Sequence, residues 1–470
     1  MAERSIRAEY TRGSIGATMM KTALAMLAGT LAMSCYNIAD TYFVGKLGGA
    51  EPLAAMGFTF PIVMLVGCIF NGTGTGIIAT VAHALGGDNQ DMARNLTSAG
   101  LFLVACASLV MGCLGVLTAN KVFGLMGAKG ETLRLVRSYM DVWFYGCVTA
   151  GISMVGNKVL ITAGRPKTAS AMTIFGMVLN VVLDPLLIFG IGVFPRLEMK
   201  GAAIATVISQ MASAGLILIV LTRIGLLRWQ AMPYTKLFAA WRNIVRYALP
   251  AIFGMLLFPL GTFVITRITA EFGVQAVAAV SAASRLESIA FVFSMSLGIG
   301  LMPMIAQNFG ARLYSRVRQC LKFSIAAAIF FLSIAAVLCF VFAWPLSAIF
   351  TSDPDVQAVM VLWLRIVPVC FCFLEIQRFS GFALIGCGHP GLDASIKALR
   401  MLGLMVPLSL LALWADSLAG LFWARTVTDV LAGAIAWFLA WKIVSRLPAD
   451  GEDASQSEHV ADSLPKGSKT

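Results

Sequence analysis

"ITAGRP" at residues 161–166 returns as "IGCGHP" at residues 385–390, shifted by 224 positions. The same shift superimposes further positions: "LAAMG" (53–57) on "VAAVS" (277–281), and Gly74, Gly76 and Gly86 on Gly298, Gly300 and Gly310. A single register that holds from residue 53 to residue 166 indicates an internal duplication.

The composition is that of a membrane protein. Of the 470 residues, 59% are hydrophobic and 12% are charged, whereas soluble domains carry about 25% charged residues. Apolar runs of spanning length recur along the chain, which predicts an all-α polytopic protein with about twelve transmembrane helices. Six helices precede the repeat point, so the two six-helix repeats are expected to be parallel, an architecture of secondary transporters.

The repeat and the charge pattern predict the organisation of the chain. We expect a six-helix lobe at 1–222, a basic cytoplasmic linker at 223–246, a second lobe at 247–445 and a disordered polar tail at 446–470. Lysine and arginine concentrate in alternate connections, which predicts cytoplasmic termini in a plasma membrane or bacterial inner membrane. The net charge of +12 is therefore attributed to these loops and not to nucleic-acid binding.

Enzymatic and metal chemistry find little support in the sequence. The 10 cysteines are scattered singly and the 3 histidines lie far apart, so no disulfide framework or zinc-type site is expected. No polar catalytic cluster is evident at a membrane interface. We predict a protein that is not an enzyme and that needs no cofactor beyond a coupling ion.

Two aspartates of the first lobe lie deep in apolar spans, Asp40 in "SCYNIADTYFVG" (34–45) and Asp184 in "NVVLDPLLIFG" (180–190). An ionised carboxyl at the centre of a spanning helix costs about 2.5–3.5 kcal/mol. No lysine or arginine is expected near the middle of this lobe. The two acids are thus either protonated or hydrogen-bonded core residues, or they bind a proton, a metal cation or a cationic ligand.

Oxygen-bearing residues accompany both acids. Asn180 lies one turn before Asp184, Asn37 lies three residues before Asp40, and Thr206 is expected at a similar depth on the next helix. Pro185 has no N–H and so frees the carbonyl of Val181. Carboxylate, amide, hydroxyl and carbonyl oxygens suit Na⁺, whereas two close carboxyls suit a proton. The sequence leaves both ions open.

The second lobe carries acids with basic neighbours at helical spacing, such as Arg425 with Asp429 and Glu375 with Arg378. We interpret most of these as structural pairs, and keep Glu287 and Glu375 as candidate substrate contacts. Further side chains either line an adaptable cavity or pack between helices: Met33, Tyr36, Phe60 and Met64. "NGTGTG" (71–76) lacks a preceding strand and is interpreted as a helix-packing motif, not as a phosphate loop.

The combination of "YNIADTYFVGKLG" (36–48), "AGRPK" (163–167), "NVVLDPLLIFG" (180–190) and "GAAIAT" (201–206) resembles multidrug and toxic compound extrusion (MATE) transporters over residues 10–445. The resemblance implies a monomer with two six-helix lobes around a central cleft. It also implies export of organic cations and related drugs, driven by inward flow of Na⁺ or H⁺.

The positions of the acids are similar to the DinF-like branch of that family. This resemblance implies a cation site at Asp40, Asn180, Asp184 and Thr206, with Tyr139 hydrogen-bonding nearby. The NorM-like branch has an acid in the middle of helix 7, and this chain has none there. A dedicated exporter or flippase of one metabolite or lipid precursor stays open as the alternative function.

Overall fold

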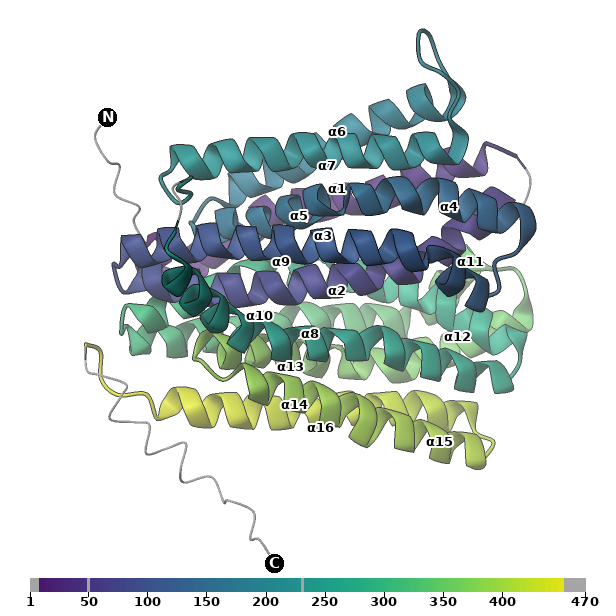
Figure 1. Cartoon of the computed structure of the whole chain (residues 1–470). Helices are drawn as coiled ribbons and strands as arrows, with labels where there is room; N and C mark the ends of the chain where they lie inside the picture. Colours follow the sequence, from purple (N-terminus) through teal and green to yellow (C-terminus); the bar gives the residue numbers. More distant parts are fainter. Residues whose placement is uncertain (1–7, 49–50, 230–231, 452–470) are drawn as a thin grey trace, which may run out of the picture. The chain divides into compact units, whose positions relative to one another are not determined.

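The computed structural model describes residues 8–48, 51–229 and 232–451, apart from the side chains of residues 33–38 (Figure 1). The described residues form helices and contain no strand. The first seven helices are α1 (Ile15–Gly45), α2 (Glu51–Gly86), α3 (Gln90–Leu125), α4 (Gly130–Tyr145), α5 (Cys147–Thr162), α6 (Pro166–Phe189) and α7 (Glu198–Arg223). A short 3-10 helix, η1 (Glu9–Thr11), precedes them.

The rest of the chain is helical as well. It contains α8 (Tyr234–Glu271), α9 (Val274–Gly310), α10 (Tyr314–Val341), α11 (Ala343–Phe350), α12 (Pro354–Ile366), α13 (Phe371–Gly386), α14 (Pro390–Ala398), α15 (Val406–Trp414) and α16 (Leu418–Ser445). A 3-10 turn, η2 (Val367–Cys370), joins α12 to α13, and a π-helical segment, η3 (Leu399–Met405), joins α14 to α15.

Eleven stretches of the described chain are long and apolar enough to cross a membrane, and counting a bent pair as one further span gives twelve. The bent pair is α4 and α5, which meet at Gly146 with a bend of 56°. A side chain at Gly146 would collide with Val207 of α7, so α5 approaches α7 closely only because this residue is glycine. The predicted all-α polytopic fold is confirmed.

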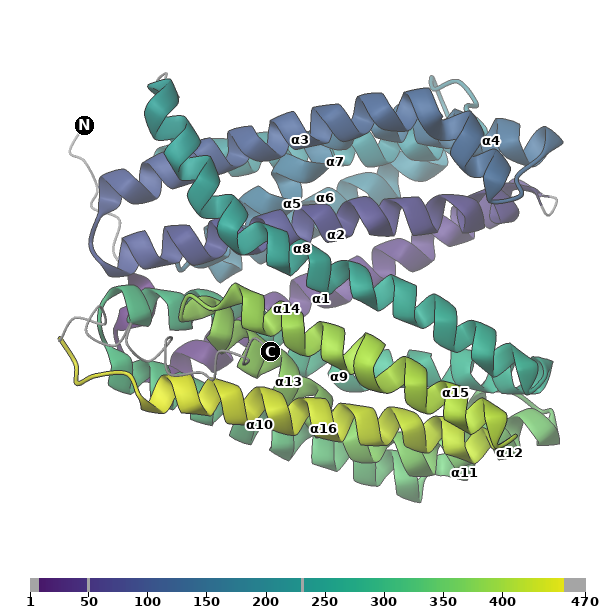
Figure 2. The same ribbon diagram turned by 60° about the horizontal axis from the view of Figure 1, so that its bottom comes forward.

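The helices form two compact units. Unit 1 comprises residues 24–81 and 89–252 of the described chain, and unit 2 comprises residues 8–23, 82–88 and 253–451. Within unit 1, α6 packs along α7; within unit 2, α14 and α15 pack along α16 (Figure 2). The boundary between the units falls inside α1, α2 and α8, and the lobe boundaries proposed from the sequence stay a prediction.

The "NGTGTG" motif packs helices together, as the sequence predicted. A Cβ atom on Gly72 would lie 2.7 Å from the backbone nitrogen of Ile252, and one on Gly76 would lie 2.5 Å from the carbonyl oxygen of Ile244. Both glycines therefore let α2 contact the backbone of α8 within unit 1. Gly74, between them, faces the side chain of Lys158 on α5 instead.

The duplication is visible in a helix crossing inside unit 2. The last turn of α2 crosses the end of α9, where Gly86 abuts the carbonyl of Gln307 and Gly310 abuts the carbonyl of His83. His83 and Gln307 are related by the same shift as Gly86 and Gly310. The contact is therefore symmetric with respect to the repeat, and a side chain larger than hydrogen on either glycine would separate the helices.

Acids of unit 2 are paired. Asp429 is fully buried and accepts from Arg400 Nε at 2.6 Å, with Arg425 Nε at 3.7 Å from its other oxygen. Glu375 pairs with Arg378 at 2.5 Å. Glu287 also pairs with Arg425. The contacts of Arg425 with Asp429 and of Arg378 with Glu375 join residues that the sequence places at helical spacing. The roles of Glu287 and Glu375 as substrate contacts stay predictions.

We expect Arg400→Met to destabilise the protein by about 3–5 kcal/mol, because it leaves a buried carboxylate without its shortest ion pair. Arg267→Met is the matched control, since Arg267 and Glu271 form an exposed pair whose loss changes stability by at most about 1 kcal/mol. Thermal unfolding of the purified variants in detergent measures both. Equal losses in the two variants would contradict the assignment of the Asp429 pair as a core element.

Candidate coupling-ion site

Three helices of unit 1 bring together four polar side chains predicted from the sequence. Asp40 lies on α1, Asn180 and Asp184 lie on α6, and Thr206 lies on α7. Their exposed fractions are 6%, 2%, 0% and 4% respectively. Four polar groups at this degree of burial in an otherwise apolar unit need hydrogen-bond or ionic partners.

Asn180 connects α6 to α7. With its amide nitrogen donating to Asp184 Oδ2 at 2.9 Å, its amide oxygen accepts from the backbone N–H of Thr206 at 3.2 Å. This orientation satisfies both ends of the amide. The arrangement fixes Asp184 and Thr206 on either side of a single amide group.

Asp40 supplies the second carboxyl. Its Oδ1 atom is buried and has no hydrogen-bond partner among the described residues. Asp40 is near enough to Asp184 for the two carboxyls to interact electrostatically. Within the described chain neither acid has an ion pair with a lysine or arginine, whereas buried charges are normally paired. The pair can therefore hold a proton or a small cation that is not covalently part of the protein.

The local sequence explains why the helices approach each other here. Gly201 at the start of "GAAIAT" abuts the carbonyl of Leu187, and a Cβ atom there would overlap that backbone. The close approach of α7 to α6 brings Thr206 beside Asn180. Pro185 lies inside α6 and offers no N–H to the carbonyl of Val181 one turn earlier. A further oxygen is thus left without its helical donor next to Asp184.

Tyr139 is buried on α4 in an apolar cluster that includes Val44, Ile188, Met199 and Ala202. The cluster joins α4 to the ends of α1, α6 and α7. A hydrogen bond from Tyr139 to the cation site stays a prediction from the family resemblance. The side chain of Asn37 lies outside the described part of the chain.

The predicted substrate-cavity residues are distributed over both units. Phe60 is 67% exposed and Met64 is half-buried, both on α2 in unit 1. Glu287 and Glu375 belong to unit 2, where each already has an arginine partner. The side chains of Met33 and Tyr36 lie outside the described part of the chain.

Sequence reasoning missed one polar contact in unit 1. No lysine was expected near the middle of this lobe, yet the ammonium of Lys158 donates to Asn71 Oδ1 at 2.8 Å and to the carbonyl oxygen of Asn71 at 3.1 Å. Two features of the sequence could have predicted this contact: an asparagine at the start of a glycine motif and a lysine inside an apolar span.

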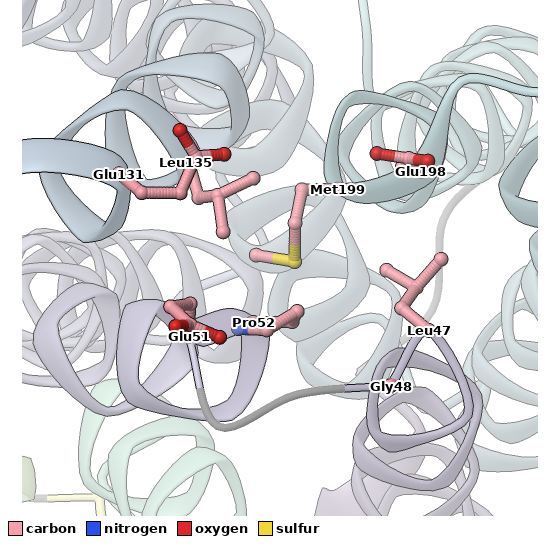
Figure 3. Close-up of a pocket in the computed structure, with 8 residues that line it drawn as sticks. All are labelled: Leu47, Gly48, Glu51, Pro52, Glu131, Leu135, Glu198 and Met199. Atoms are coloured by element: carbon pink, nitrogen blue, oxygen red, sulfur yellow. The ribbon is translucent and has the colours of Figure 1, made fainter.

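Unit 1 also contains a small pocket of about 160 Å³, lined by Leu47, Gly48, Glu51, Pro52, Glu131, Leu135, Glu198 and Met199. Figure 3 shows its three glutamates arranged around Leu135 and Met199. Glu131 is bonded to Arg134 and Glu198 to Arg196. The described residues contain no group of three or more His, Cys, Asp or Glu side chains that could hold a metal ion.

Comparison with known proteins identifies the family. The MatE family profile matches residues 25–186 and 250–411, two segments of equal length, one in each repeat. A relative named as an FAD transporter of Shewanella oneidensis is 33% identical over 93% of this chain and 97% of its own length. The multidrug export protein MepA of Staphylococcus haemolyticus is 23% identical over 94% and 96% of the two chains.

Solved structures agree with the fold. The structure of the MATE transporter VcmN of Vibrio cholerae superimposes with a TM-score of 0.86 at 26% identity, covering 92% of this chain and 97% of VcmN. An outward-facing multidrug resistance MATE transporter gives a TM-score of 0.85 at 21% identity, over 94% and 98% of the two chains. The family profile and the full-length relatives establish that this chain belongs to the MATE family of multi-pass membrane transporters, and that it is a transporter and not an enzyme.

Proposed function

We propose that the protein is a cation-coupled exporter that exchanges a substrate for H⁺ or Na⁺ across a plasma membrane or bacterial inner membrane, with both termini in the cytoplasm. One observation carries this proposal: Asp40 and Asp184 are both buried, interact electrostatically and lack a basic partner among the described residues. Their placement is similar to that of the DinF-like branch.

The site supports coupling through charge compensation. The site places two carboxyls in an apolar surrounding, and binding of one H⁺ or Na⁺ lowers their net charge and mutual repulsion. The amide of Asn180 and the hydroxyl of Thr206 offer further oxygens to a metal cation. A cation drives export only if the outward-open and inward-open states bind it with different affinities. We expect a movement of Asp40 on α1 to produce this difference in cation affinity between the two states.

Two substrate classes are supported by different relatives. MepA, named as a multidrug export protein, supports export of organic cations and related drugs by this chain. The FAD transporter supports the alternative, a dedicated exporter of one metabolite. The FAD transporter is 33% identical to this chain and MepA is 23% identical, over similar coverage. The higher identity favours the single-metabolite alternative, with a flavin nucleotide as the substrate.

We expect Asp40→Asn to abolish gradient-driven transport, because asparagine keeps the shape of the side chain but neither takes up a proton nor supplies a negative charge to Na⁺. The measurement is substrate uptake into inside-out vesicles under an imposed pH gradient or Na⁺ gradient, at equal expression. Asp88→Asn is the matched control, since Asp88 is exposed at the end of α2 with φ of 55°, a conformation that asparagine also tolerates. Transport by the unaltered protein that ignores both gradients would contradict the coupling proposal.

The same vesicles separate the two substrate classes. Ethidium represents organic cations and FAD represents the flavin nucleotide. We expect gradient-driven FAD accumulation to exceed ethidium accumulation, because the relative of higher identity is the FAD transporter. Ethidium accumulation with no FAD accumulation would instead establish multidrug export and exclude the dedicated flavin exporter.

A further inference from the structure

We propose that Lys158 binds the anionic part of the exported solute, a phosphate or a carboxylate group. This inference rests on the proposed export function and narrows its substrate class.

The direction of the side chain is unusual for a lysine in a membrane span. Lys158 lies four residues before Thr162, the end of α5, and a lysine so near a helix end normally extends toward the adjacent membrane surface. Its ammonium instead contacts Asn71, which lies 20 residues after the first residue of α2 and 15 before the last. The Cα–Cβ bond of a helical residue tilts toward the helix N-terminus, which here is the direction away from the Thr162 end. Lys158 therefore carries its charge toward the middle of the span.

The glycine motif leaves space for the Lys158 side chain to cross α2. A Cβ atom on Gly74 would lie 2.8 Å from Lys158 Cδ and 3.3 Å from Lys158 Nζ, so the lysine stem crosses α2 at a residue without a side chain. Gly72 and Gly76, on either side of it, contact α8. The motif "NGTGTG" thus has two roles, since it packs α2 on α8 and it seats the lysine.

The partner of Lys158 is held in place. Asn71 Nδ2 donates to the carbonyl of Gly67 at 2.9 Å, which turns the amide oxygen toward the ammonium. The hydroxyl of Thr75 donates to the carbonyl of Asn71 at 3.0 Å. Asn71 therefore orients the ammonium with two neutral oxygens and does not neutralise its charge.

Charge compensation is incomplete at Lys158. An ammonium has three N–H donors, and the two hydrogen bonds described above both go to Asn71. No carboxylate pairs with Lys158 in the described chain, in contrast to Arg378, Lys397 and Arg400 of unit 2, each of which pairs with an acid. The side chain is half-buried, so part of it stays accessible. A phosphate or carboxylate of the solute would supply the missing negative charge through charge-assisted hydrogen bonds.

Riboflavin and FMN test this inference because they share one ring system and differ by one phosphate. We expect Lys158→Met to weaken FMN and FAD binding to the purified protein by about 10-fold or more, since a hydrogen bond to a charged group contributes about 1.5–3 kcal/mol. Riboflavin binding should stay within about 2-fold, and Lys158→Arg should retain most FMN affinity. Flavin fluorescence quenching gives these affinities, with Lys121→Met at an exposed lysine of α3 as the control.

Folate, which carries carboxylates and no phosphate, distinguishes the two anion classes. Loss of folate binding alongside FMN binding in Lys158→Met supports a general anion site, and loss of FMN binding alone assigns it to phosphate. Equal losses of riboflavin and FMN affinity would overturn the inference and assign Lys158 the structural role of joining α5 to α2. Failure of the unaltered protein to bind FMN, FAD and folate would also overturn it. Vesicle uptake of ethidium under a gradient would then show that the export function stands independently.

Discussion

A charged side chain inside a bilayer is stable only when another group compensates its charge, and this constraint separates the two units of the structure. In unit 2, three buried acids are compensated within the fold by ion pairs: Asp429 with Arg400, Glu375 with Arg378 and Asp393 with Lys397. Unit 1 leaves Asp40, Asp184 and Lys158 without an opposite charge among the described residues. Charged groups without an opposite charge in the protein are the ones that can bind a coupling ion or a substrate.

Glycine determines where these uncompensated groups meet their neighbours. Gly201 brings α7 against the backbone of α6, which places Thr206 beside Asn180 and Asp184. Gly74 opens a passage over α2 for Lys158. A side chain at Gly201 would hold α7 away from the backbone of α6, whereas a side chain at Gly74 would displace the stem of Lys158.

The two charged features of unit 1 suit opposite ligands. The carboxyls suit a cation from the ion gradient, and the lysine suits an anionic solute. Under the proposed function, relatives named as an FAD transporter and as multidrug exporters would share the coupling site and differ in their substrate contacts. The ion pairs of Glu287 and Glu375 also favour an anionic solute over an organic cation, because acids that already pair with arginine are poor sites for organic cations.

Sequence alone determined the all-α membrane fold and the two repeats, because apolar runs and a constant shift are properties of the linear chain. It also predicted a cation site at the deep acids of the first lobe, and that assignment stays a prediction. It also predicted that "NGTGTG" packs helices, since a glycine stripe in an apolar span has few other uses. It could not predict that Gly74 faces Lys158, or that Asp429 takes Arg400 in addition to Arg425 four residues before it. Those contacts join helices distant in sequence, and only the tertiary packing decides which side chains of different helices come within hydrogen-bond distance.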